Sequence, residues 1–348
     1  MTNPTPAIVT QSAVRRLPRV ALWLFCLAYV LPGLLGREPW KGNEITAFGH
    51  MLALSEGVSS WLNPSVWGVA PDLDALLPYW LGALAIQLSP SWLSADLASR
   101  IPFAFLLGLT LASTWYGAYY LALSPQAQPV AFAFGGEAQP KDYARTLADC
   151  SVLALIACLG LAQLSHEASP IVAQLAFASC AFYGIAALPY HPKYSLSALI
   201  VGLAGLCLSG APSFAVLMAA GSGLLCLLDR QSTDAATGRR HAIWLLLTGI
   251  GVAALATLLD VWHWRLQALH NDWSYWRSLL RLLVWFTWPV WPLALVTVWR
   301  WRLQWTSLHW SRHLVLPMWF ASLSVVTGLL TLSAERTLLL SLPALATL

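Results

Sequence analysis

Nine stretches of this 348-residue chain are apolar over nearly the length that a helix needs to cross a lipid bilayer. A helix of about 20 apolar residues spans the roughly 30 Å hydrocarbon core. The chain is 58% hydrophobic and only 10% charged, so it has too few charges to cover a water-facing surface. We therefore expect an all-α polytopic membrane protein and exclude a secreted, disordered, fibrous or nucleic-acid-binding chain. The stretches are 20–36, 101–123, 149–164, 171–188, 195–210, 213–228, 242–261, 282–299 and 314–332.

The two ends of the chain differ from these spans. Residues 1–19 are polar and basic, and we expect a cytoplasmic N-terminal tail that is disordered over residues 1–14. Residues 20–348 would form one transmembrane domain of nine to ten spans. A tenth apolar run begins near Thr337 and reaches the last residue after about 12 residues, which is too short to span. We therefore expect the chain to stop within a tenth helix.

One shorter apolar stretch, 76–88, decides the orientation of everything after it. Prolines at 78 and 90 bound it, and its length of about 13 residues favours a re-entrant or interfacial helix. If it does not span, and the N-terminus is cytoplasmic, 12 of the 19 basic residues lie inside, as the positive-inside rule requires. We therefore expect residues 37–100 to form the first outer loop, with juxtamembrane helices.

Candidate functional residues gather in this first outer loop. A helix is expected from about Asn43 to Glu56, with Asn43 as its N-cap and Glu44 in its first turn. A carboxylate there faces the positive end of the helix dipole and could act as a general base. Stabilising the helix start is the alternative role, and the sequence does not separate the two.

The second half of the loop carries further polar and aromatic candidates. Asp74 precedes a proline-opened helix with the interface-seeking side chains Tyr79 and Trp80. Arg100 stands at the mouth of the next span, where a guanidinium can bind phosphate bidentately. Snorkelling toward lipid headgroups is the alternative for that arginine.

The order of these motifs resembles the GT-C superfamily of polyprenyl-phosphate-sugar-dependent glycosyltransferases, near the aminoarabinose transferases and protein O-mannosyltransferases (glycosyltransferase family 39). The resemblance rests on four short motifs, the first of which places an acid early in the first outer loop, and it extends over most of the chain. The motifs are Asn43-Glu44, Leu76-Leu77-Pro78-Tyr79-Trp80, Ala98-Ser99-Arg100-Ile101-Pro102 and the segment from Ser333 to Pro343. The chain departs from the family pattern where Asn43 replaces the first acid of a pair.

The resemblance implies an inverting transfer of a sugar from a polyprenyl-phosphate donor to a lipid, glycan or protein acceptor. The site would face the periplasm of a bacterial inner membrane, with membrane lipids around it. Glu44 would be the catalytic base, with Asp74 and Glu167 as weaker candidates. Three arginines would hold the donor phosphate and three side chains would line the substrate groove. These are Arg100, Arg265 and Arg336 for the phosphate, and Tyr79, Trp80 and His270 for the groove.

Glu167 and two histidines of a later outer segment have ordinary structural interpretations. Glu167 lies in a short turn before Pro170, where capping the next helix is the more common role. His263 and His270 are seven residues apart on one helix face, but no matching ligand cluster makes them a metal site. No cofactor is predicted, and a divalent metal is unsupported. The six cysteines show no CxxC pairing and are expected to be reduced, buried thiols.

Two other classes of function remain open. A solute transporter or lipid flippase usually places ionisable residues near the bilayer midplane, whereas the charges here lie at the ends of the apolar runs. A catalytically inactive or truncated relative acting as a scaffold would fit the asparagine at position 43. Phosphate-loop and dinucleotide-binding signatures are missing from the sequence, so a soluble nucleotide-sugar site is unsupported.

Overall fold

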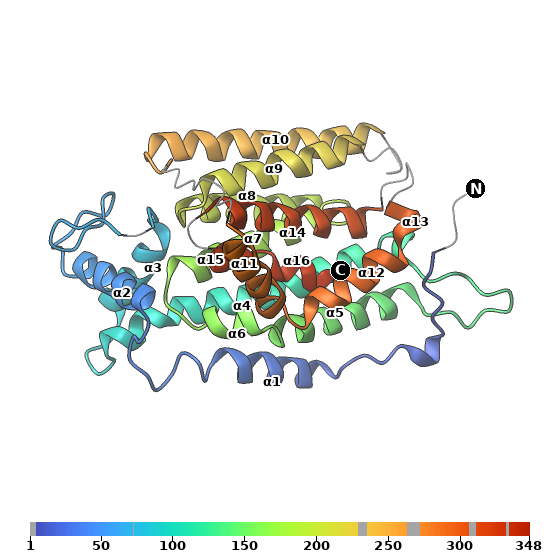
Figure 1. Ribbon diagram of the computed structural model, residues 1–348, viewed down its shortest axis with the longest axis horizontal. Helices are drawn as coiled ribbons and strands as arrows, with labels where there is room; N and C mark the ends of the chain where they lie inside the picture. The colour runs from blue at the N-terminus through green and yellow to red at the C-terminus, as the bar shows by residue number, and fades with distance from the viewer. Residues whose placement is uncertain (1–4, 72, 229–234, 263–271, 306–310, 332–333) are drawn as a thin grey trace.

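The computed structural model of the chain is a bundle of helices (Figure 1). It describes residues 5–71, 73–228, 235–262, 272–305, 311–331 and 334–348, and no strand longer than an isolated bridge occurs among them. The first part contains α1 (Arg19–Val30), α2 (Gly42–Ser55), α3 (Leu77–Leu88), α4 (Ala95–Ala122), α5 (Pro140–Ile156), α6 (Leu159–Leu164), α7 (Pro170–Ala187) and α8 (Pro192–Leu208). The second part contains α9 (Pro212–Leu228), α10 (Ala235–Leu258), α11 (Trp273–Phe286), α12 (Val290–Arg300), α13 (Arg302–Trp305), α14 (Arg312–Leu330), α15 (Ala334–Leu339) and α16 (Leu342–Thr347).

Helix α7 is the centre of the bundle. Its apolar window is 94% buried, and it packs against α4 on one side and α8 on the other. Glycines let the backbones approach: a Cβ at Gly202 would lie 2.5 Å from the Ala181 nitrogen, and one at Gly184 would lie 2.8 Å from the Leu199 nitrogen. Small residues serve the same purpose in transmembrane helix pairs generally, because lipid gives apolar helices no hydrophobic reason to associate.

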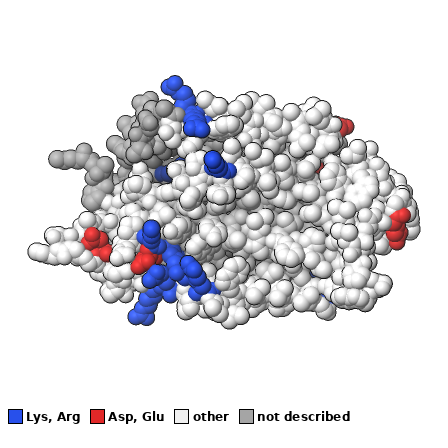
Figure 2. All heavy atoms as spheres, turned by 180° about the vertical axis from the view of Figure 1, so that it is seen from behind, with Lys and Arg blue, Asp and Glu red and all other residues white. Residues whose placement is uncertain are grey.

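Polar segments lie at opposite ends of the bundle. Helices α2 and α3 form the left end in Figure 1, which we call the first-loop end. The N-terminal segment and the hairpin after α4 lie at the other end, which we call the N-terminal end. On the face that Figure 2 shows, Lys and Arg side chains lie toward the N-terminal end together with some acidic side chains, whereas the far first-loop end shows acidic side chains.

The expectation of a disordered tail is wrong for residues 5–14. The Val130 N–H donates to the Ala7 carbonyl at 2.9 Å, and the Ala138 N–H donates to the Val9 carbonyl at 3.0 Å. Just beyond, Arg16 pairs with Asp142 at 3.2 Å. Residues 5–14 are ordered because their main chain and the Thr5 side chain find partners more than 120 residues away, which polar composition does not reveal.

Four described helices are long and apolar enough to cross a bilayer: α4, α7, α10 from Thr237, and α14. The bent pair α11 and α12 would add a fifth, and α1, α3, α8 and α9 are shorter apolar helices. The nine to ten crossings expected from the sequence therefore stay a prediction, because they require shorter helices to cross as well.

Two expected spans are broken. The stretch 149–164 contains the end of α5 and all of α6, with Cys158 in extended backbone between them. The stretch 282–299 contains parts of α11 and α12, which meet at 89°. Pro289 lies at that corner, where its ring and missing N–H disfavour a continuous helix. Hydropathy does not register either break, because the residues on both sides are apolar.

Candidate active site at the first-loop end

Glu44 lies in the first turn of α2, as expected, but it is completely buried. The N-cap position belongs to Lys41, whose carbonyl accepts from the Glu44 N–H at 3.0 Å, so the expected cap at Asn43 is wrong. A buried carboxylate loses its hydration and must be compensated by donors or cations. The neighbours of Glu44 supply both.

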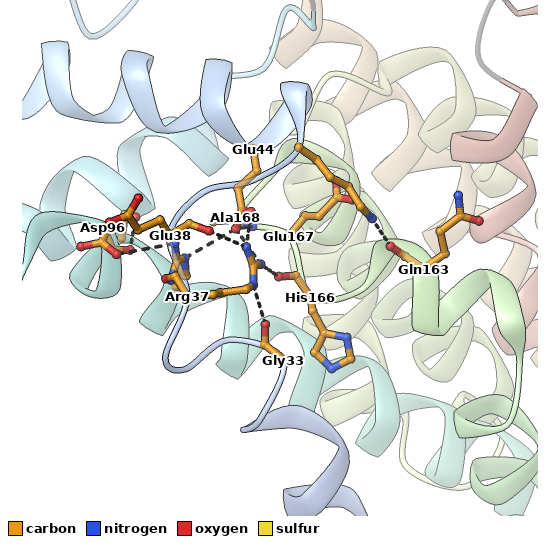
Figure 3. A network of polar contacts seen from close by, with 12 residues as sticks. Gly33, Arg37, Glu38, Glu44, Asp96, Gln163, His166, Glu167 and Ala168 are labelled. Atoms are coloured by element: carbon orange, nitrogen blue, oxygen red, sulfur yellow. Dashed lines mark hydrogen bonds and ion pairs between the residues drawn. The ribbon is translucent and has the colours of Figure 1, made fainter.

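Arg37 is the main partner of Glu44, and Figure 3 shows the two side chains facing one another. Its Nη1 donates to Oε2 at 2.5 Å and its Nη2 donates to Oε1 at 2.9 Å, a bidentate pair. The Ala168 N–H also donates to Oε1, at 3.2 Å. Such fork-like pairs combine charge with fixed geometry. The contacts tie the loop after α1 to the turn before α7.

Arg100 completes this cluster from the first turns of α4. Only 1% of the residue is exposed, and its Nε lies 3.5 Å from Glu44 Oε1. Its Nη1 donates to the Arg37 carbonyl, and its Nη2 lies 3.5 Å from Asp96 Oδ2. Arg100 is therefore brought to Glu44, as the sequence suggested, but it is buried among protein groups.

Glu167 belongs to the neighbouring turn and pairs with Lys41. The ammonium of Lys41 donates to Glu167 Oε1 at 2.7 Å and also to the Gln163 carbonyl. The other oxygen, Oε2, is buried and accepts no hydrogen bond from the described residues. The helix-capping role that the sequence favoured is wrong, because Ser169 occupies the N-cap position of α7.

His166 fixes the same turn against the chain after α1. Its Nε2 lies 2.8 Å from the Tyr29 carbonyl, and its carbonyl accepts from Arg37. The ring fills the space beside Gly33, where a Cβ would come within 2.2 Å of it. A glycine is required there because the imidazole takes the place of a side chain.

A cavity of about 820 Å³ opens beside Asn43, the residue before Glu44. Helices α11 and α15 form its walls. Arg336 donates from Nη2 to Asn43 Oδ1 at 2.5 Å, which joins α15 to the start of α2. The polar and aromatic residues of the lining are Asn43, Tyr275, Ser278, Arg281, Trp285, Thr331, Glu335 and Arg336. Two guanidinium groups and one carboxylate in a cavity of this size suit a ligand that carries a charged group.

Three further predicted residues, Asp74, Tyr79 and Trp80, do not line this cavity. Asp74 lies beside the turn between α8 and α9, where its carbonyl would be 3.3 Å from a Cβ at Gly210. Tyr79 is 3% exposed and packs against His50, and Trp80 donates to the Trp61 carbonyl at 2.7 Å. Their part in a substrate groove stays a prediction. Arg265 and His270 lie outside the described residues.

Three residues of the site were not singled out from the sequence. Arg37 is close to Glu44 along the chain, but charge patterns alone do not distinguish it from an exposed loop residue. Arg281 lies one helical turn after Arg277 on an amphipathic helix, which is the signal that could have identified it. Glu335 lies in the segment from Ser333 to Pro343, in which the resemblance assigned a role only to Arg336. Among the described residues no group of three or more His, Cys, Asp or Glu could hold a metal ion.

The burial of Glu167 predicts a pH-dependent contribution to stability. Burial raises the pKa of its carboxyl above the ordinary 4.5, although Lys41 opposes the rise. The folded protein then holds this proton more tightly than the unfolded chain, so the contribution is present below pH 4.5 and is lost as the pH rises through the raised pKa. The difference in Tm, wild type minus Glu167→Gln, should decrease between pH 4 and pH 7. A difference that grows over this range would contradict the assignment.

The sequence of this chain has no significant match among known families, but its fold is similar to that of a solved structure. No family model matches the sequence, and no curated protein is significantly similar to it. A solved structure that is similar is ArnT from Cupriavidus metallidurans bound to undecaprenyl phosphate, with a TM-score of 0.63 at 13% identity. The match covers 94% of this chain and 59% of ArnT, so the chain spans about 59% of the length of that protein. The all-α, GT-C-like transmembrane fold predicted from the sequence is therefore confirmed.

Proposed function

We propose that this protein is an integral-membrane glycosyltransferase that moves a sugar from a polyprenyl-phosphate donor to an acceptor hydroxyl. The observation that carries the proposal is the cavity beside Asn43, where Arg281 and Arg336 line opposite walls. The likeness of fold to a protein crystallised with undecaprenyl phosphate supports this class of donor.

The chemistry requires cations where the leaving group departs. The bond between the anomeric carbon and the phosphate oxygen breaks, and negative charge builds up on the phosphate. Two guanidinium groups placed beforehand stabilise this charge better than water does, because they need no reorganisation. In the proposal Arg281 and Arg336 hold the phosphate, whereas Arg100 is already engaged by Glu44 and Asp96.

The family resemblance predicts Glu44 as the base, but its surroundings do not favour that role. In the described conformation both of its oxygens accept from protein donors and none of its surface is exposed. It would reach an acceptor only after Arg37 released it. Its position next to Asn43 gives it a second role, since it fixes the turn of α2 from which Asn43 contacts Arg336.

The acceptor and the membrane side are also part of the proposal. The acceptor would be a lipid, glycan or protein, and the reaction would take place at the periplasmic face of a bacterial inner membrane. The gathering of basic side chains toward the N-terminal end on the face in Figure 2 supports a cytoplasmic N-terminus, because basic residues favour that side.

Donor binding tests the proposal directly. Arg281→Ala and Arg336→Ala should each weaken binding of undecaprenyl phosphate by about 10- to 100-fold, because a hydrogen bond to a charged group contributes about 1.5–3 kcal/mol. Binding would be measured with the purified chain in detergent.

Arg277→Ala is the matched control, since Arg277 lies one turn earlier on α11 and does not line the cavity. It should change the affinity less than threefold. Equal losses in all three variants would indicate general attraction to a basic surface and would refute a phosphate site in this cavity.

A further inference from the structure

Three glutamates at or near the first-loop end differ in their surroundings. Glu44 is bound by Arg37 and Arg100, and Glu167 is bound by Lys41. Glu335 is exposed, lines the cavity, and forms no ion pair within 4 Å with the residues that the structure describes. A general base must reach the acceptor hydroxyl within hydrogen-bond distance, directly or through one water.

We propose that Glu335 is the catalytic base that takes the proton of the acceptor hydroxyl in the cavity between α11 and α15. The inference rests on the proposed function and names the residue that performs its proton transfer. It differs from the expectation for Glu44, because it assigns the base to the cavity itself.

The short helix α15 places the required groups side by side. Leu338 and Leu339 are buried and anchor the helix to the bundle. Ala334, Glu335 and Arg336 line the cavity in succession. The proposed base and one phosphate-binding cation therefore come from adjacent residues of one short helix.

Helix α11 supplies the opposite wall. Tyr275 and Trp285 face the cavity along with Arg281. Aromatic side chains combine an apolar face with a polar edge, which suits a ring that carries both C–H and O–H groups. In the proposal a sugar binds between these rings and α15, with its phosphate toward the arginines.

The proposed step balances in atoms and charge. The acceptor oxygen forms a bond to the anomeric carbon while its proton moves to the Glu335 carboxylate. The bond from the anomeric carbon to the phosphate oxygen breaks, and its electron pair leaves with polyprenyl phosphate. Arg281 and Arg336 stabilise the negative charge that develops on this phosphate. Glu335 then loses its proton to water, and attack from the face opposite the phosphate inverts the anomeric centre.

The test compares Glu335→Gln, Glu335→Asp and Glu44→Gln with wild type. The purified full chain in proteoliposomes is supplied with radiolabelled undecaprenyl-phosphate-linked aminoarabinose or mannose and with membrane lipids as acceptor. Release of undecaprenyl phosphate gives kcat and KM. Binding of undecaprenyl phosphate alone is measured separately. Glu56→Gln, an exposed glutamate at the end of α2, is the matched control.

Glu335→Gln is expected to lower kcat by 10²- to 10⁴-fold, the usual contribution of a general base. Its affinity for undecaprenyl phosphate should stay within about twofold, and its Tm should not change because the side chain is exposed. Glu335→Asp should recover part of the rate. The acidic limb of the pH–rate profile should disappear in Glu335→Gln and persist in Glu56→Gln.

Other outcomes overturn the inference. If Glu335→Gln keeps kcat within threefold while Glu44→Gln abolishes it, the base is Glu44. If Glu335→Gln loses donor affinity in parallel with rate, Glu335 serves binding and not proton transfer. If wild type releases undecaprenyl phosphate from neither donor, the proposed function itself fails, which distinguishes the two failures.

Discussion

Arg37→Gln is expected to destabilise the protein by about 3–5 kcal/mol, because it leaves the fully buried Glu44 carboxylate without its bidentate partner. Arg100 remains, but its Nε is 3.5 Å away and it is shared with Asp96. The Tm in detergent should fall on the order of 10 °C. The contacts of Arg37 with Gly33 and the His166 carbonyl would be lost as well.

Two further variants distinguish the effect of an unpaired buried carboxylate from a general loss of stability. The double variant Arg37→Gln with Glu44→Gln should be more stable than Arg37→Gln alone, because no unpaired carboxylate is then left buried. Arg16→Gln removes the partner of an ion pair at the N-terminal end whose arginine side chain is 49% exposed. It should cost only about 0.2–1 kcal/mol. Equal losses of stability in Arg16→Gln and Arg37→Gln would contradict the claim that the burial of Glu44 makes its ion pair important.

Gly202→Ala is expected to separate α7 from α8. The new methyl group would lie 2.5 Å from the Ala181 nitrogen and 2.8 Å from the Phe177 carbonyl oxygen, and main-chain atoms cannot turn aside as a side chain can. Overpacking a tight interior costs about 1–3 kcal/mol and occasionally more. A thiol-reactive dye would follow unfolding, because Cys180 is buried beside the Ala198 carbonyl in the same interface.

Gly251→Ala in α10 is the matched control. It is also a helical glycine, but a Cβ there meets no atom within 4 Å. Alanine is a better helix former than glycine by about 1 kcal/mol. The variant should therefore be as stable as wild type or more stable. If both variants behave alike, close backbone packing at Gly202 is not what limits stability.

The features that could be predicted from the sequence depend on neighbours along the chain. Apolar runs identify α4, α7, α8, α9 and α14. Prolines at 140, 170, 192 and 212 mark the first residues of their helices, where a missing N–H costs nothing. The place of Glu44 in the first turn of α2 was also predicted.

The features that could not be predicted depend on partners far apart in sequence. Asn43 and Arg336 are 293 residues apart, and Lys41 and Glu167 are 126 apart. No local pattern encodes such pairs, because each charge looks like an ordinary loop charge until the helices assemble. For the same reason, the cavity and the exposed carboxylate of Glu335 became visible only in the folded chain.

Helix α11 has two faces with different surroundings. Trp273 is 79% exposed and Leu280 is 63% exposed on its outward side, whereas Tyr275 and Arg281 line the cavity. A helix is about 10 Å across, so a single layer separates the cavity from the outside of the bundle. The hydrocarbon chain of the proposed donor could stay among the lipid tails. Only the head group of the donor would then have to pass α11 to reach the cavity. The protein would then never have to extract its substrate from the bilayer.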